Sequence, residues 1–291
     1  MNYELGWMDT STQIPVPIAD HINRKYLDIQ YYGDDPLQKL DLYLPNNVQG
    51  SYPVILHVHG GGFNHCDKSD WHLYPMFFAL NEGFAVAAIN YRLAPASPFP
   101  SAIYDVKSAA RWITDNANKY GLDSENIFLW GTSAGGNLIS NVANTWYDNN
   151  FGEPVRGELR AAAALCPVIN FPEAIAEANK KAEMIKKITD DLNGMELEGY
   201  ITPDIDNLIK ASADTYINSK TPAYYLQHGT GDSMVPVSQS TSYAEKLKKV
   251  IGEENVILDL LQGEDHAGPE TAYMEEKHNL PIFKFFKKYI R

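Results

Sequence analysis

Six short, almost uninterrupted hydrophobic runs recur along the chain between residues 53 and 261. Each is five to eight residues long and has little polar alternation. Such runs are typical of strands buried on both faces, which is the environment of a parallel sheet. The predicted strands occupy residues 53–58, 84–91, 126–130, 160–166, 223–227 and 256–261.

Two further β-rich segments precede these runs, at residues 26–32 and 38–44. The turn residues at 33–36, Gly-Asp-Asp-Pro, predict that the two segments form an antiparallel hairpin. Hydrophobic residues spaced three and four apart predict helices between the strands and at the end of the chain. The fold is therefore predicted to be α/β, with helices on both faces of a mostly parallel sheet of about eight strands.

The gap from residue 167 to residue 221 is longer than a crossover between two strands requires. It carries two amphipathic patterns of its own, from Ile175 to Leu192 and from Ile205 to Tyr216. The breakers Gly194, Gly199 and Pro203 separate them. We interpret residues 1–291 as one catalytic domain and residues 167–221 as a helical cap inserted into it.

The segment Gly131-Thr132-Ser133-Ala134-Gly135 directly follows the predicted strand at 126–130 and opens a predicted helix. A serine at such a turn adopts strained backbone geometry, and glycines two residues to either side avoid side-chain collisions. The hydroxyl is then exposed at the end of the strand. Ser133 is therefore a candidate nucleophile.

The segment HGGGF at residues 59–63 directly follows the strand at 53–58. Backbone N–H groups without side chains can approach a substrate carbonyl and stabilise the oxyanion that develops in the transition state. The candidate donors are Gly61, Gly62 and Ala134, whereas His59 is expected to brace the loop. The alternative, a glycine-rich turn without a ligand, is less favoured because of the serine turn downstream.

A serine hydroxyl also needs a general base and a group that orients this base. Asp232 follows the strand at 223–227, and His266 follows the strand at 256–261, so both are expected at the carboxyl edge of the sheet. Ser133, Asp232 and His266 also occur in the chain order of an α/β-hydrolase triad. Asp265 and Glu264 remain alternatives for the carboxylate, and His228 is the rival for the base.

Composition narrows the classes of partner and site. The formal net charge of −13 argues against a nucleic acid or an anionic membrane as partner, because both select basic patches. The two cysteines, Cys66 and Cys166, are interpreted as reduced thiols without metal-ligand partners nearby in sequence. No signal peptide or membrane span is recognised, so a cytoplasmic location is expected. A homodimer is left open.

Four segments together resemble the esterase and lipase branch of the α/β-hydrolases: HGGGF, YRLAPASPFP at 91–100, GTSAGGN at 131–137 and HGTGDSMVP at 228–236. The resemblance runs from about residue 36 to the end. It is strongest to the hormone-sensitive-lipase-like group and to bacterial esterases that include feruloyl and acetyl-xylan esterases. Thr132 departs from the first group, which commonly has an acidic residue there, and so favours the second.

The resemblance implies an acyl-enzyme mechanism with Ser133, Asp232 and His266 as triad, Gly61, Gly62 and Ala134 as oxyanion donors, and no cofactor. The two cysteines alone already make a metal site unlikely. The expected function is hydrolysis of short-chain or small carboxylic esters. The alternatives are a serine peptidase of the same fold and a non-catalytic ligand-binding protein. Phe63, Trp71, Tyr74 and the apolar face of the cap could line an apolar pocket, or they could be ordinary packing.

Overall fold

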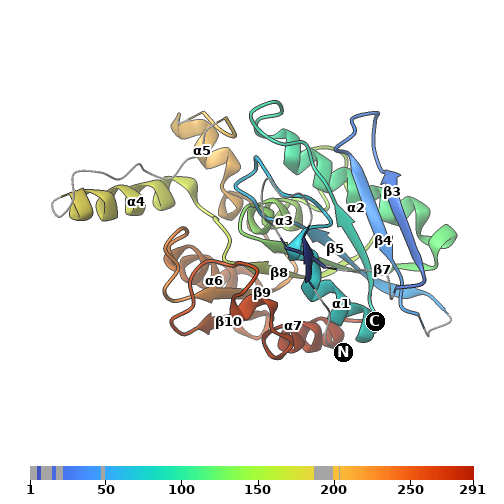
Figure 1. Ribbon diagram of the computed structural model, residues 1–291. Helices are drawn as coiled ribbons and strands as arrows, with labels where there is room; N and C mark the ends of the chain where they lie inside the picture. Colours follow the sequence, from blue (N-terminus) through green and yellow to red (C-terminus); the bar gives the residue numbers. More distant parts are fainter. Residues whose placement is uncertain (1–4, 8–14, 18–21, 47–49, 187–198, 203) are drawn as a thin grey trace.

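The computed structural model of residues 1–291 describes all of them except 1–4, 8–14, 18–21, 47–49, 187–198 and 203. An eight-stranded sheet forms the centre of the described chain, in the order β10-β9-β8-β7-β5-β6-β4-β3 (Figure 1). Its strands are β3 (Lys25–Gln30), β4 (Lys39–Tyr43), β5 (Tyr52–Val58), β6 (Ala85–Ile89), β7 (Leu122–Thr132), β8 (Leu159–Leu165), β9 (Ala223–Gly229) and β10 (Val256–Leu261). A separate antiparallel pair joins β1 (Leu5–Trp7) to β2 (Pro15–Pro17).

The predicted sheet is confirmed. All six hydrophobic runs form strands, and β5 to β10 pair with one another in parallel. The predicted hairpin is the antiparallel pair of β3 and β4, and β4 joins the sheet by pairing antiparallel with β6. Because the parallel strands share one direction, the loops that follow them meet at a single edge of the sheet.

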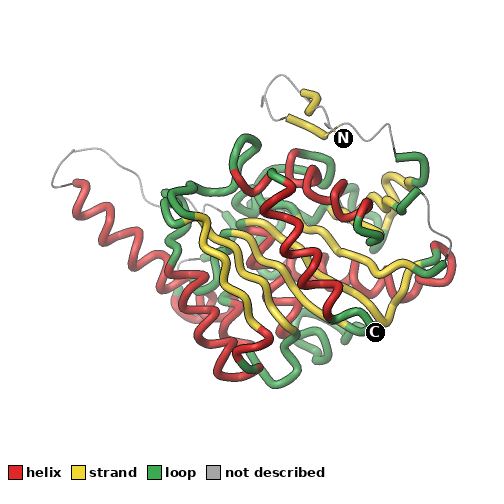
Figure 2. Tube along the Cα trace, turned by 90° about the horizontal axis from the view of Figure 1, so that it is seen from below, coloured by secondary structure: helices red, strands yellow, loops and turns green. Residues whose placement is uncertain are grey.

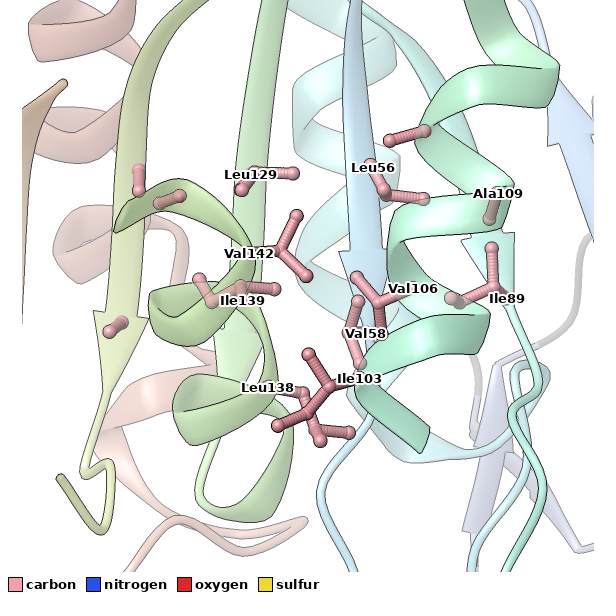
Figure 3. Close-up of a cluster of buried hydrophobic side chains, with 14 of the residues drawn as sticks. Leu56, Val58, Ile89, Ile103, Val106, Ala109, Leu129, Leu138, Ile139 and Val142 are labelled. Carbon is pink, nitrogen blue, oxygen red and sulfur yellow. The ribbon is translucent and has the colours of Figure 1, made fainter. Parts of the chain in front are cut away.

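Helices cover both faces of the sheet (Figure 2). One face packs on α2 (Ser101–Tyr120), α3 (Ala134–Asn144) and α6 (Ser238–Ile251), and the other packs on α1 (Tyr74–Asn81) and α7 (Glu276–Lys288). Successive strand residues face opposite sides, so Leu129 lies in the first core and Phe128 in the second. Figure 3 shows part of the first core, where α2 and α3 bring Ile103, Val106, Leu138, Ile139 and Val142 against Leu56, Val58 and Leu129 of the sheet.

Helix α1 and the short 3-10 helix η1 (Trp71–Leu73) were not predicted from the sequence. Met76, Phe77 and Phe78 are all buried in α1, so the helix has no polar stripe from which a helical period could be read. Helix α7 begins at Glu276, six residues before its first predicted hydrophobic position, Ile282.

The segment between β8 and β9 contains helix α4 (Phe171–Lys186), helix α5 (Ile205–Ala211) and the 3-10 helix η2 (Ala213–Tyr216). Both predicted amphipathic patterns therefore begin in helices. The part of the first pattern from 187 to 192, together with Gly194 and Pro203, lies outside the described residues. Among the helices described, none combines the length and the apolar character needed to cross a membrane.

Candidate active site

Ser133 lies at the junction between β7 and α3 and has a left-handed backbone, with φ 53° and ψ −118°. The glycines on either side are required sterically. A Cβ at Gly131 would lie 2.4 Å from the carbonyl oxygen of Gly135, and a Cβ at Gly135 would lie 2.3 Å from that of Val58. The sequence therefore folds into a sharp turn that presents the serine hydroxyl at the edge of the sheet.

The structure brings Ser133, His266 and Asp232 together. The Ser133 hydroxyl donates to His266 Nε2, with Oγ and Nε2 2.9 Å apart. His266 Nδ1 donates to Asp232 Oδ2 at 2.7 Å. The acceptor at Nδ1 is a carboxylate, so the proton of the neutral ring is on Nδ1 and Nε2 can accept the serine proton. The three side chains thus have the hydrogen-bond order of a nucleophile, a base and an orienting carboxylate.

The Asp232 side chain is fully buried and accepts hydrogen bonds from four donors. The backbone N–H groups of Met234 and Val235 donate to Oδ1, while His266 and His228 donate to Oδ2. Burial alone would raise the pKa of Asp232, but these hydrogen bonds outweigh it and hold the pKa well below its usual range. Asp232 is therefore ionised when it orients His266.

His228, the rival for the base, contacts the same carboxylate from the other side. Its Nε2 lies 3.2 Å from Asp232 Oδ2 and 3.1 Å from the carbonyl oxygen of Val235. Both partners are acceptors, so Nε2 carries the proton and Nδ1 accepts from the Ser240 hydroxyl at 2.7 Å. The side chain is completely buried, and its hydrogen bonds are made to groups other than Ser133. The contacts of His228 therefore hold Asp232 in position.

Asp265 and Glu264, the alternatives for the carboxylate that orients the base, accept hydrogen bonds from other groups. Asp265 accepts hydrogen bonds from the backbone and hydroxyl of Ser233 and from the backbone N–H of His266. Glu264 accepts from the backbone N–H of Ala272. In the described chain, neither carboxylate contacts the imidazole ring, so the geometry favours Asp232.

Cys166 is a neighbour of the candidate base that sequence reasoning missed. Its sulfur lies 4.0 Å from His266 Nε2, and the residue is buried at the end of β8 with a φ of 38°. Burial would lower the pKa of His266, but the Cys166 sulfur and the Asp232 carboxylate raise it above its ordinary value of 6.5. The signal was available in the sequence, because Cys166 ends a predicted parallel strand and such ends meet at one edge.

The loop after β5 carries two of the candidate oxyanion donors, Gly61 and Gly62, and the third, Ala134, begins α3. Gly61 and Gly62 have φ of +100° and +56°, conformations that side chains rarely adopt. In the part of the chain that the structure describes, the N–H groups of Gly61, Gly62 and Ala134 have no protein acceptor. They are thus available for a ligand oxygen. The loop and the serine turn are adjacent, since a Cβ at Gly60 would lie 3.3 Å from the Cβ of Ser133.

Buried side chains hold this loop from behind. His59 donates from Nδ1 to the carbonyl oxygen of Gly60 at 2.8 Å, and its ring stacks on Tyr91 with centroids 4.4 Å apart. The Tyr91 hydroxyl is 3.2 Å from the carbonyl oxygen of His59 and 3.1 Å from that of Gly60. Burial lowers the pKa of His57 to about 3 and that of His59 to about 4, so both rings are neutral.

Two clusters contain metal-binding types of side chain: Cys66 with Asp70 and His72, and Cys166 with Asp232 and His266. The prediction concerned neighbours in sequence: it overlooked Asp70 and His72 close to Cys66, whereas Cys166 meets Asp232 and His266 only in the fold. In both clusters, however, the aspartate already accepts a 2.7 Å hydrogen bond from its histidine. This pairing engages one carboxylate oxygen and the Nδ1 atom in each cluster.

The predicted aromatic lining divides into two groups. Phe63 stacks on Tyr200 of the inserted segment, with centroids 3.7 Å apart and planes 6° apart. Trp71 instead stacks on His72, and Tyr74 packs edge-on against Phe78. Trp71 and Tyr74 therefore belong to the packing around α1, whereas Phe63 connects the Gly61–Gly62 loop to the insertion.

Comparison with known proteins identifies matching families and folds. The model of the BD-FAE family matches residues 40–247. The "Probable carboxylic ester hydrolase LipM" of Mycobacterium tuberculosis is 29% identical over 239 residues, which are 80% of this chain and 54% of the relative. "Esterase LipC" of the same organism is 27% identical over 79% of this chain and 57% of its own length. The chain thus spans about half the length of these curated relatives.

Solved structures share the fold. A structure described as "Bifunctional GH43-CE" from Bacteroides eggerthii superposes with a TM-score of 0.74 and 25% identity, over 91% of this chain and 35% of the other. A truncated carbohydrate esterase from gut microbiota gives a TM-score of 0.75 and 21% identity, over 94% of this chain and 99% of the other.

Proposed function

Because the chain belongs to the BD-FAE family, we propose that it is a serine carboxylesterase in which Ser133 is the nucleophile, His266 the general base and Asp232 the orienting carboxylate. The observation that carries the proposal is the continuous hydrogen-bond path from Ser133 through His266 to Asp232, with distances of 2.9 and 2.7 Å. The curated relatives named as esterases support the same class of reaction.

In the acylation step, Ser133 Oγ attacks the carbonyl carbon of an ester while its proton moves to His266 Nε2. The new imidazolium is stabilised by Asp232, which remains a carboxylate. The carbonyl oxygen becomes an oxyanion and accepts hydrogen bonds from the N–H groups of Gly61, Gly62 and Ala134. Each donor of this kind contributes on the order of 3 kcal/mol to the barrier reduction.

The tetrahedral intermediate then collapses. The bond between the carbonyl carbon and the alcohol oxygen breaks, His266 Nε2 gives its proton to the leaving alcohol, and an acyl-Ser133 ester remains. In the second step His266 removes a proton from water, the hydroxide attacks the acyl carbon, and the proton returns to Ser133 as the carboxylic acid leaves. Atoms and protons balance without a cofactor.

We further propose that residues 1–291 form one catalytic domain and that 167–221 act as a cap beside the site. The contact between Tyr200 of the insertion and Phe63, the residue after Gly62, supports this role. The side chain of Asn137, in the first turn of α3, also donates to the carbonyl oxygen of Ala211 at 3.1 Å. A ring stack this close to the loop limits the space available there, which favours short acyl groups.

The experiment is hydrolysis of p-nitrophenyl esters of increasing acyl length by the wild type, Ser133→Ala and His266→Ala. We expect turnover of acetate and butyrate esters, a decline at longer chains, and loss of turnover in both variants. His278→Ala is the matched control, since His278 is a half-exposed residue of α7, and it should keep wild-type rates.

Turnover that survives in Ser133→Ala would exclude the proposed nucleophile. Hydrolysis of peptides without hydrolysis of any ester would support the serine peptidase instead, and ligand binding without turnover would support the binding protein. The cytoplasmic location and the homodimer stay predictions.

A further inference from the structure

The inserted segment meets the Gly61–Gly62 loop through one pair of aromatic rings. Phe63, the residue after Gly62, and Tyr200 of the insertion lie with ring centroids 3.7 Å apart and ring planes 6° apart. Phe63 is 2% exposed and Tyr200 is 1% exposed. The pair is therefore internal packing rather than a surface for a ligand, and it can act on the site only by holding the loop.

The Gly61–Gly62 loop needs such support at its end. Residues 60–62 are three glycines in a row, and glycine loses more conformational freedom on folding than any other residue. Phe63 is the first residue after them that has a side chain, and its φ of 69° is one that such residues adopt only when packing holds them there. Its carbonyl oxygen accepts a 2.9 Å hydrogen bond from the N–H of Ala94. This hydrogen bond and the ring stack together fix the end of the loop.

Tyr200 is itself held by its backbone and its ring. Its carbonyl oxygen accepts a 2.7 Å hydrogen bond from the N–H of Phe99, whose ring packs edge-on against the Tyr200 ring with centroids 6.3 Å apart. A Cβ at Gly199 would lie 2.4 Å from the Cβ of Pro95, so the two chain segments touch closely. Phe171, the fully buried first residue of α4, lies 6.4 Å from Tyr200 between ring centroids. The ring therefore has a fixed place from which to support the loop.

The ring of Tyr200, and not its hydroxyl, makes this contact. The hydroxyl oxygen is buried and forms no hydrogen bond with any residue that the structure describes. Removing the hydroxyl therefore breaks no hydrogen bond to these residues, whereas removing the ring uncovers one face of Phe63. Tyr200→Phe and Tyr200→Leu consequently separate the two parts of the side chain.

We propose that Tyr200 is a positioning residue for the candidate oxyanion donors. Its ring fixes Phe63, and Phe63 holds the N–H groups of Gly61 and Gly62 in place. The inference rests on the proposed esterase function and gives the insertion a part in the chemistry as well as in the shape of the site. Donors that are already aimed at the oxyanion need no rearrangement as charge develops. A loop that can move loses part of this advantage although the triad is intact.

The first test is steady-state kinetics on p-nitrophenyl acetate, the ester with the smallest acyl group of the series. Tyr200→Leu should lower kcat by about tenfold with little change in KM, because the donors act mainly on the developing oxyanion. The loss is smaller than the roughly 10²- to 10³-fold loss caused by removing a donor outright, since the hydrogen bond from Ala94 remains. Tyr200→Phe should keep the wild-type kcat. A loss that appears in KM alone would overturn the proposal.

A trifluoromethyl ketone tests the oxyanion donors directly. Ser133 Oγ bonds to its carbonyl carbon, the hydroxyl proton passes to His266, and the carbonyl oxygen becomes an oxyanion, so the adduct resembles the tetrahedral intermediate. Tyr200→Leu should weaken inhibition by about the same factor as it lowers kcat/KM. Unchanged inhibition beside a lowered kcat would place the damage away from the donors and refute the role of Tyr200.

A double-mutant cycle tests the route through Phe63. Phe63→Leu should lower kcat about as much as Tyr200→Leu does. The double variant should lose little more than either single variant, because both changes remove the same contact. If the two losses multiplied instead, the residues would act independently and the proposed route would be wrong.

A matched variant measures the effect of general destabilisation, because losing a buried ring also weakens the fold. Phe84→Leu removes a fully buried ring just before β6, at the edge of the sheet opposite the one where Ser133 follows β7. It should lower Tm, as Tyr200→Leu does, but keep the wild-type kcat. Equal losses of kcat in the two variants would assign the effect to destabilisation and contradict the inference.

Failure of the proposed function and failure of this inference give different results. A wild type that hydrolyses no p-nitrophenyl ester contradicts the esterase itself and removes the basis of the inference with it. An active wild type whose Tyr200→Leu variant is folded and equally active contradicts the role of Tyr200 alone.

Discussion

Two Asp–His pairs in this molecule have the same hydrogen bond. His266 Nδ1 lies 2.7 Å from Asp232 Oδ2, and His72 Nδ1 lies 2.7 Å from Asp70 Oδ1. In both pairs burial opposes ionisation of the aspartate, and hydrogen bonds from the partner histidine lower its pKa. Taken alone, the pairs are indistinguishable.

Their surroundings differ. The His266 side chain is 11% exposed and its Nε2 faces the Ser133 hydroxyl, whereas the His72 side chain is 3% exposed and its ring stacks on Trp71. The backbone of Gly60 lies between His72 and the nucleophile, since a Cβ there would be 2.8 Å from His72 Nε2 and 3.3 Å from the Cβ of Ser133. The surroundings therefore fit the proposed role of His266 as a general base, whereas the His72–Asp70 pair is packed in the core.

Replacing the histidines should separate the two roles most clearly. His266→Gln should lower kcat by up to about 10⁶-fold, because the proton acceptor is lost. The change in Tm should be small, because Asp232 keeps its hydrogen bonds from Met234, Val235 and His228. His72→Gln should instead lower stability by about 1 to 3 kcal/mol, because Asp70 loses a buried partner, while the folded fraction keeps most of its kcat. Steady-state kinetics and thermal unfolding of both variants make the comparison. A large loss of kcat in a fully folded His72→Gln would contradict it.

Replacing the aspartates should separate the same two roles, but with a smaller loss of kcat than His266→Gln causes. Asp232→Asn should cost about 10⁴-fold in kcat, because an amide can leave His266 in the wrong tautomer. Asp70→Asn should act on the midpoint of urea unfolding and leave the kcat of the folded protein close to wild type. If Asp265→Asn lost as much activity as Asp232→Asn, the choice of carboxylate would be wrong.

Activity and stability should also depend on pH over different ranges. The pKa of His266 is raised above 6.5, and a base must be unprotonated, so kcat/KM should fall as the pH drops through a value above 6.5. The pKa values of His57 and His59 are lowered to about 3 and 4, so their contribution to stability is present above pH 6.5 and is lost progressively below it. Rate profiles and urea unfolding from pH 9 to pH 5 test both. If activity and stability fell over the same pH range, the assignment of the two effects to different histidines would be contradicted.

Cys166→Ala should have the smallest effect. Removing the sulfur 4.0 Å from Nε2 takes away one of the groups that raise the pKa of His266, so the acidic limb of the rate profile should move to lower pH. The kcat at the plateau should change little. Cys66→Ala is the control, because that thiol neighbours the Asp70–His72 pair, and its rate profile should match the wild type.

Much of this fold could be predicted from the sequence because the signals are local. Strands buried on both faces leave hydrophobic runs, and a side chain at Gly131 would collide with Gly135 of the same turn. Helix α1 could not be predicted, since its residues are buried on nearly all sides. The three candidate triad residues could be found because each follows a strand, and parallel strands end at one edge.

The contacts that distinguish the two Asp–His pairs are not local. His228 of β9 is only four residues from Asp232, but the Ser240 hydroxyl that sets its tautomer comes from α6. Cys166 meets His266 across 100 residues of sequence. The end of its strand places Cys166 at the same edge of the sheet, but which side chains touch there depends on how the loops pack, and no local pattern of residues encodes that packing.

The most direct test of the central claim is covalent labelling with a fluorophosphonate, which reacts with an activated serine, followed by mass spectrometry of the digested protein. The account predicts a single label on Ser133, absent in Ser133→Ala, strongly slowed in His266→Gln and unchanged in folded His72→Gln. A label on another serine, or hydrolysis that continues after Ser133 is fully labelled, would contradict it.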